Sequence, residues 1–210
     1  MAKTEPFDLL TEQYDRWFEE NRYIYLSEID AIKALLPVFK KGVEIGVGTG
    51  RFALPLGLKF GVEPSCEMRK IAMERGLEVI DGIAESLPFP NESYDLALMV
   101  TTVCFLDDIQ KAFREVHRIL VPSGAFVVAF IDKESPIGKL YLNMKNRDPF
   151  YRLATFYSTE EILDNLQKAG FKDFRVVQTL FRNLKEINSI EPVKEGYGEG
   201  SFVVVRGIKR

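Results

Sequence analysis

Between residues 42 and 131, short apolar segments alternate with segments of helical periodicity, and this alternation constrains the fold more than any other feature. Strand-like runs occupy residues 42–46, 59–64, 77–82, 94–100 and 124–131. Helical patterns occupy residues 50–57, 65–76 and 107–120. Strands that alternate with helices are typical of a parallel sheet covered by helices on both of its faces. The sequence therefore predicts an α/β fold.

Helical patterns also precede this region, and a helix and two strands follow it. Residues 7–21 place aromatic side chains at helical spacing, and a second helical pattern covers 25–39, ending near Pro37. Ser158 and Glu161 form a capping-box pattern at the start of a helix over 158–170. Two closing strands are expected at 171–180 and 201–207, with a polar loop at 181–200 between them. We expect an N-terminal helical segment at 1–40 and one domain at 41–210.

The composition excludes several classes of partner. The formal net charge is -3, so no excess of basic charge attracts nucleic acid or an anionic membrane. The apolar runs are too short to span a bilayer, and the segment MAKTEPFDLL lacks the pattern of a signal peptide. Two cysteines cannot form a disulfide framework or a metal site alone. We expect a cytoplasmic protein that binds neither nucleic acid nor membrane.

The glycine-rich segment VEIGVGTGRF, residues 43–52, predicts a ligand site at the end of the first strand. Arg51 stands where a dinucleotide-binding loop has its third glycine, and no Gly-Lys-Ser/Thr follows. Glu44 would face the pocket, repel a pyrophosphate and tolerate a cation. Glu63 ends the second strand and could accept hydrogen bonds from a ribose. These features describe S-adenosylmethionine, an adenosine joined to an amino acid by a sulfonium.

Four segments in order resemble the class I S-adenosylmethionine-dependent methyltransferases, of the small-molecule type related to the ubiquinone and menaquinone methyltransferases. They are EIGVGTG, GVEPSCEM, DGIAESLPF and AFREVHRILVPSGAFVV. The resemblance implies S-adenosylmethionine as cofactor and S-adenosylhomocysteine as product. It implies that the glycine loop cradles the methionine part, that Glu63 holds the ribose, and that Pro64 and Met68 border the adenine. The cofactor-binding residues implied are Glu44, Gly46, Gly48, Gly50, Glu63, Pro64, Met68, Ile83, Ala84 and Thr101.

At one position the sequence departs from the family pattern. Ile83 stands where the family has an aspartate, and an aliphatic side chain accepts no hydrogen bond from the adenine amino group. The backbone N–H of Ala84 could still reach a ring nitrogen.

The resemblance also implies a Rossmann-like sheet of seven mostly parallel strands, with the last strand antiparallel and the N-terminal helices forming a lid. Methyl transfer is an in-line displacement that mainly requires positioning and exclusion of water, so no catalytic residue is singled out. A small-molecule acceptor is expected beside Tyr14, Trp17, Thr102 and Phe105. Asp107 is interpreted as part of a helix cap, and no metal is expected. Two alternatives stay open: a non-catalytic module that binds the cofactor, and a nicotinamide oxidoreductase.

Overall fold

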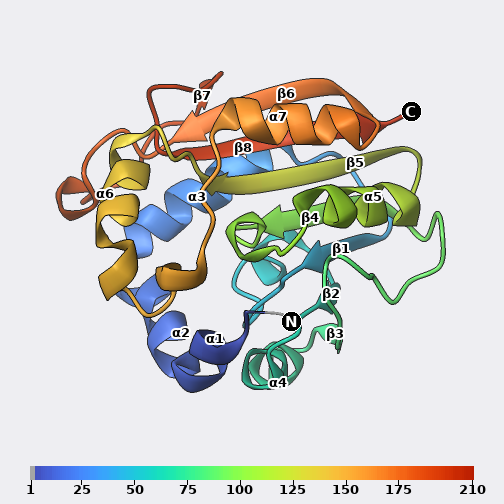
Figure 1. Ribbon diagram of the computed structural model, residues 1–210, viewed down its shortest axis with the longest axis horizontal. Helices are drawn as coiled ribbons and strands as arrows, with labels where there is room; N and C mark the ends of the chain where they lie inside the picture. Colours follow the sequence, from blue (N-terminus) through green and yellow to red (C-terminus); the bar gives the residue numbers. More distant parts are fainter. Residues whose placement is uncertain (1–2) are drawn as a thin grey trace.

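The computed structural model describes residues 3–210, so the first two residues of the expected N-terminal segment lie outside the described part. Within the described part, eight strands form one sheet in the order β3-β2-β1-β4-β5-β8-β6-β7 (Figure 1). The strands are β1 (Gly42–Ile45), β2 (Phe60–Val62), β3 (Glu78–Ile80), β4 (Tyr94–Val100), β5 (Leu120–Ile131), β6 (Phe171–Thr179), β7 (Lys194–Glu195) and β8 (Phe202–Lys209).

The predicted Rossmann-like sheet is confirmed. Strands β3, β2, β1, β4 and β5 pair in parallel, and β8 lies antiparallel between β5 and β6. The seven expected strands are all present. The two-residue strand β7 was not expected. It lies within the segment 181–200, which was predicted to be a loop throughout, and it pairs with β6.

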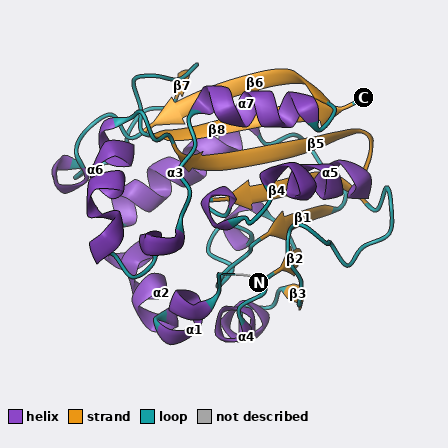
Figure 2. Ribbon diagram, viewed as in Figure 1, coloured by secondary structure: helices purple, strands orange, loops and turns teal. Residues whose placement is uncertain are grey.

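Helices cover both faces of the sheet, as Figure 2 shows. They are α1 (Glu5–Leu9), α2 (Thr11–Glu20), α3 (Arg22–Leu35), α4 (Cys66–Glu74), α5 (Ile109–Ile119), α6 (Pro136–Met144) and α7 (Thr159–Lys168). Short 3-10 helices are η1 (Leu54–Leu56), η2 (Val103–Phe105), η3 (Lys145–Arg147), η4 (Tyr151–Leu153) and η5 (Leu184–Glu186).

Two apolar clusters bury the two faces of the sheet. Along β4, Leu96 and Leu98 pack into the cluster that includes α3, whereas Ala97 and Met99 pack into the cluster that includes α5 and α7. A strand buried on both faces has no polar side, which explains the continuous apolar run at 96–100. The helices α5 and α7 therefore share one face of the sheet, and α3 lies on the other.

Capping residues set the starts of three helices. Ser65 accepts a hydrogen bond from the Met68 N–H at the start of α4, and Asp108 caps α5 in the same way. Ser158 and Glu161 form the predicted capping box at the start of α7. These side chains satisfy N–H groups that the first turn of a helix leaves without partners.

Three local predictions were wrong. Residues 50–57 form turns and the single 3-10 turn η1 instead of an α-helix, because Pro55 and Gly57 interrupt so short a segment. The pattern at 7–21 forms two helices that meet at Leu10, whose backbone is not helical. The helix α6 was not predicted, although Ser135 at its N-cap and Pro136 at its first position are typical signals of a helix start.

Candidate active site

A cavity of about 440 Å³ lies at the carboxyl ends of the parallel strands. The arrowheads of β4 and β5 point toward this edge, where α1, α2 and α6 gather (Figure 1). Its lining comes from the loops after β1, β2, β3, β4 and β5 and from α1, α2 and α3. Its size suits a small-molecule site, and open α/β sheets bind ligands at this edge.

The glycine loop brings backbone close to side chains of other segments. Gly46 has a φ of +71°, and a Cβ there would lie 2.3 Å from Oγ1 of Thr102. Gly48 has a φ of +54°, and its Cβ would lie 3.4 Å from the hydroxyl oxygen of Tyr14. Positive φ values and close approach both favour glycine. At Gly46 and Gly48 the loop therefore exposes backbone atoms to the cavity, in space that a side chain would occupy.

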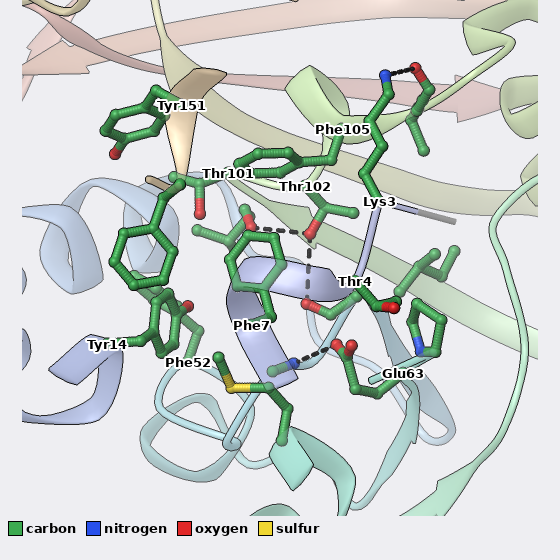
Figure 3. A pocket seen from close by; sticks show the side chains of 18 of the residues that line it. Lys3, Thr4, Phe7, Tyr14, Phe52, Glu63, Thr101, Thr102, Phe105 and Tyr151 are labelled. Atoms are coloured by element: carbon green, nitrogen blue, oxygen red, sulfur yellow. Dashed lines mark hydrogen bonds between the residues drawn. The ribbon is translucent and has the colours of Figure 1, made fainter. Parts of the chain in front are cut away.

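Glu63 links the glycine loop to the end of β2. Its carboxylate accepts hydrogen bonds from the N–H of Gly48 at 2.8 Å and from the N–H of Ser65 at 2.9 Å. Burial raises the pKa of Glu63 to about 7, although both hydrogen bonds favour the charged form. Figure 3 shows the Glu63 side chain at the border of the cavity, with the Gly48 contact as a dashed line. Each carboxylate oxygen can accept a further hydrogen bond from a ligand.

Most of the residues singled out from the sequence meet at this cavity. The lining includes Gly46, Gly48, Glu63, Pro64, Met68, Ile83, Ala84 and Thr101 of the expected cofactor set, and Tyr14, Trp17, Thr102 and Phe105 of the expected acceptor set. Segments far apart in the sequence supply them, so the sheet topology brings the two sets together.

Two residues of the cofactor set do not line the cavity. Glu44 was expected to face the pocket, but its side chain is 1% exposed, and its buried Oε2 has no hydrogen-bond partner among the described residues. Burial raises the pKa of Glu44 well above its ordinary value. Gly50 packs against α4 and β3, where a Cβ would lie 2.6 Å from a methyl group of Leu77. The third glycine thus serves packing, and the carboxylate of Glu44 lies beneath the loop.

Thr101 carries backbone strain at the end of β4. Its φ is +50°, a conformation that β-branched residues rarely adopt. The N–H of Thr101 donates to the carbonyl of Ala129 at 2.8 Å, which ties the strained residue to β5. Such strain persists where the surrounding structure fixes it and is common at functional sites. Thr101 and Thr102 form the middle of the cavity floor (Figure 3).

A charged cluster fastens α2 to the glycine loop and to the end of α4. Asp15 of α2 accepts hydrogen bonds from Thr49 Oγ1 at 2.6 Å, Arg51 Nε at 2.9 Å and Arg75 Nη1 at 2.8 Å. Burial raises the pKa of Asp15, but the two guanidinium groups outweigh burial and hold this pKa well below its ordinary value. Arg51, which excluded a dinucleotide loop, therefore holds α2 against the glycine loop.

Further contacts fasten α1. Asp8 accepts a hydrogen bond from the hydroxyl of Ser65 at 2.6 Å, and Glu5 forms an ion pair with Arg152 at 2.8 Å. The ring of Phe7 lies 4.9 Å from that of Phe105, centroid to centroid. The helices α1 and α2 thus touch the loops after β2 and β4 as well as η4.

Aromatic side chains dominate the rest of the lining. The rings are those of Phe7, Tyr14, Trp17, Phe18, Phe52, Phe105, Tyr141, Phe150 and Tyr151. Tyr141 and Tyr151 stack with ring centroids 4.6 Å apart. Burial, followed by the charges of Glu44 and Glu63, raises the pKa of Tyr14 far above its ordinary value, so Tyr14 keeps its proton. In Figure 3 the rings of Tyr14 and Tyr151 lie across the cavity from Glu63.

Sequence reasoning missed a deeply buried acidic residue of the lining. Glu28 of α3 is 4% exposed and lines the cavity. It stands in the buried stripe formed by Ile24, Ala31, Ile32 and Leu35. A carboxylate within an apolar helical stripe was the signal that could have revealed it.

Comparison with known proteins gives the family. A family model described as a methyltransferase domain matches residues 43–128. A crystal structure from Thermotoga maritima, described as a S-adenosylmethionine-dependent methyltransferase and possible histamine N-methyltransferase, shares 53% identity and a TM-score of 0.96. The match covers 98% of this chain and 99% of that chain. The chain belongs to the class I S-adenosylmethionine-dependent methyltransferases.

Two other relatives extend the comparison. An uncharacterized protein of Methanocaldococcus jannaschii shares 43% identity, over 97% of this methyltransferase and 98% of the relative. The YcgJ protein of Bacillus subtilis shares 20% identity and a TM-score of 0.66, with 89% of this chain and 99% of that chain covered, and shows a common fold alone. The cofactor of this methyltransferase is S-adenosylmethionine, and its product is S-adenosylhomocysteine.

The cavity is suited to that cofactor. A buried carboxylate, Glu63, is available to ribose hydroxyls, and the backbone at Gly46 and Gly48 leaves room that a Cβ would fill. Over residues 3–210, no group of three or more His, Cys, Asp or Glu side chains is arranged to hold a metal ion. None of the helices in that range is long and apolar enough to cross a bilayer.

Proposed function

We propose that this methyltransferase transfers the methyl group to a small organic acceptor held in the aromatic part of the cavity, by in-line displacement. One observation carries the proposal: a single cavity joins the glycine loop and Glu63 to a set of aromatic rings. The cofactor supplies an activated methyl group on a sulfonium. The protein then needs to bind the acceptor in line with that group and to exclude water.

We propose that the residues of the lining divide between the two ligands. Glu63 would hold the ribose, and Pro64, Met68, Ile83 and Ala84 would border the adenine. The backbone of Gly46 and Gly48 would hold the methionine part. Thr101, Thr102, Phe105, Tyr14 and Trp17 would lie toward the acceptor. Contact with the cavity supports each assignment.

The helices α1 and α2 would act as a lid over this cavity. Asp15, Asp8 and Glu5 fasten them to the glycine loop, to Ser65 and to Arg152. By contrast, α3 packs against β6 and β8 and belongs to the core. We therefore place the moving part of the N-terminal segment 1–40 within residues 5–20, with Tyr14 and Trp17 on its inner side.

Two acceptor chemistries are candidates. The sequence motifs resemble the ubiquinone and menaquinone methyltransferases, whose acceptors are quinol-type rings, and the aromatic lining suits a ring. The Thermotoga relative is called a possible histamine N-methyltransferase, which is an amine chemistry. Both are compact groups suited to a cavity of about 440 Å³.

Calorimetry followed by a turnover assay tests the proposal. We expect binding of S-adenosylmethionine and S-adenosylhomocysteine, no binding of NAD, and release of S-adenosylhomocysteine with at least one acceptor of a panel of amines, quinols and catechols. Cofactor binding without turnover across the panel would support a non-catalytic module. Binding of NAD alone would exclude methyl transfer.

A further inference from the structure

Glu28 is a buried acid without a partner in the protein. Its side chain is 4% exposed, yet residues 3–210 provide neither a hydrogen bond nor an ion pair to its carboxylate. A buried charge without compensation is costly, so the acid stays mostly protonated near neutral pH unless a ligand supplies a cation. Because Glu28 lines the cavity, a ligand can supply the missing partner.

Glu28 lies at the end of the cavity away from the ribose-binding acid. It extends from α3, which packs against β5, β6 and β8, and the ends of two of these strands also reach the lining, at Ile131 of β5 and at Leu180 directly after β6. Glu63 follows β2, which is three strands away from β5 in the sheet. At ~4.8 Å per strand, these strand ends lie roughly 14 Å apart. The position of Glu28 is therefore on the acceptor side.

Aromatic rings surround this end of the cavity. Tyr14, Tyr141 and Tyr151 line the same cavity as Glu28, and after burial the charge of Glu28 contributes to the raised pKa of each of them. The faces of aromatic rings attract cations, and a carboxylate among them adds a charge-assisted hydrogen bond. A neutral quinol would leave the carboxylate without an ionic partner, and a quinolate would be repelled by it.

We propose that Glu28 binds the acceptor and that the acceptor is a basic amine that enters as its ammonium ion. This inference rests on the methyl transfer proposed above and assigns the acceptor class. The ammonium would pair with the carboxylate of Glu28 while the tyrosine rings enclose it.

Glu28 also takes the proton that has to leave before attack. The ammonium gives one proton to the carboxylate, and the freed nitrogen lone pair forms the new N–C bond. The S–C bond breaks with its electron pair passing to sulfur, which yields S-adenosylhomocysteine and a methylated ammonium. The proton on Glu28 then passes to water when the products leave. Burial raises the pKa of Glu28 to about 8, which brings its basicity closer to that of an alkylamine than an ordinary carboxylate's is.

The other ionisable groups near Glu28 do not replace it in this role. Tyr14, Tyr25, Tyr141 and Tyr151 interact with its charge, and burial raises the pKa of each of them, so they stay protonated near neutral pH. Asp148 also lines the cavity, but its Oδ1 accepts the N–H groups of Phe150 and Tyr151.

Calorimetry on the protein loaded with S-adenosylhomocysteine tests the inference without turnover. The probes are histamine, 2-phenylethylamine and putrescine, each paired with its hydroxyl isostere. At pH 7 a carboxyl with a pKa of about 8 is roughly nine-tenths protonated, so formation of the ion pair releases about 0.9 proton per amine bound. Titrations in phosphate and in ACES, which differ in ionisation enthalpy, measure this release.

The matched variants are Glu28→Gln and Glu28→Asp. We expect Glu28→Gln to abolish proton release and to lower kcat/KM for the best amine on the order of 100-fold or more, the range for loss of a general base. The affinity for S-adenosylmethionine should stay within threefold, and Glu28→Asp should recover part of both signals. If Glu28→Gln does not fold, Glu28→Asp and the proton release of the wild type decide the outcome.

Three outcomes would overturn the proposal. Methylation of quinols but of none of the amines would refute the acceptor class and leave methyl transfer intact. A loss of S-adenosylmethionine affinity in Glu28→Gln would assign Glu28 to the cofactor. Amine affinity that is the same in the wild type and in Glu28→Gln, and no greater than that of the hydroxyl isosteres, would show that Glu28 does not form the ion pair. Absence of turnover with every acceptor would instead count against the proposed function.

Discussion

Replacement of Asp15 by asparagine tests what holds α2, which forms part of the lid proposed above, against the glycine loop. Asp15 accepts hydrogen bonds from Thr49, Arg51 and Arg75, and its side chain is 17% exposed. The partners are also shielded, with side-chain exposures of 18% for Arg51 and 28% for Arg75. Asparagine keeps the shape but removes the charge, so both guanidinium groups lose their shared partner.

The free energy lost in Asp15→Asn can be estimated from the burial of the cluster. Removal of one partner from a buried ion pair costs about 3–5 kcal/mol, and partial exposure of this cluster favours the lower value. About 3 kcal/mol corresponds to roughly a 150-fold change in the docking equilibrium. We expect amide hydrogen exchange within α2 to accelerate by roughly that factor in Asp15→Asn. Fluorescence of Trp17, the only tryptophan in the chain, should report the same opening.

The control removes a different partner of the same arginine. Glu19 pairs with Arg51 but its side chain is 67% exposed, so Glu19→Gln should cost about 1 kcal/mol or less. If the two variants exchange within threefold of each other, the Asp15 cluster does not hold the lid. Acid provides a second test: because the pKa of Asp15 is depressed in the folded state, its stabilisation is present above the ordinary range of aspartate and is lost as the pH falls.

Three further predictions concern the cavity. Gly46→Ala should destabilise the fold by about 1–3 kcal/mol more than Gly57→Ala in urea denaturation, because both have positive φ but only position 46 meets Thr102; equal losses would refute the steric argument. Glu63→Ala should weaken S-adenosylmethionine binding by about 1.5–3 kcal/mol in calorimetry, and an unchanged Kd would mean that the ribose is held elsewhere. The raised pKa of Glu28 stabilises the fold below about pH 4.5, and this stabilisation is lost as the pH rises through about 8. The unfolding free energy of wild type should therefore fall relative to Glu28→Gln by about 1.4 kcal/mol per pH unit between these limits, and parallel pH profiles would contradict the assignment.

Local patterns predicted most of the fold. The strand at 94–100 and the capping box of Ser158 and Glu161 were found at the expected positions. Each depends on residues close in the chain, whose spacing fixes which groups can meet. The prediction failed at residues 50–57, where helical periodicity was outweighed by Pro55 and Gly57.

The site was only partly predictable. Gly46, Gly48 and Glu63 follow strand ends, so the edge of a parallel sheet brings them together. Glu44 also lies near a strand end, yet its carboxylate is buried outside the cavity lining. Side chains alternate between the two faces of a strand, but the sequence does not show which loop covers each face, and so it could not predict that Glu44 is buried.

The sequence by itself determined the fold class, the family and the cofactor, because these depend on strand–helix order and on short motifs whose residues are neighbours in the chain. The tertiary structure decided the rest of the site. It placed Asp15 on Arg51 and Arg75, and it turned Glu28 of α3 toward the cavity instead of toward solvent. These contacts join positions that are distant in the chain, and their energies depend on burial, which exists only once the helices have packed against the sheet.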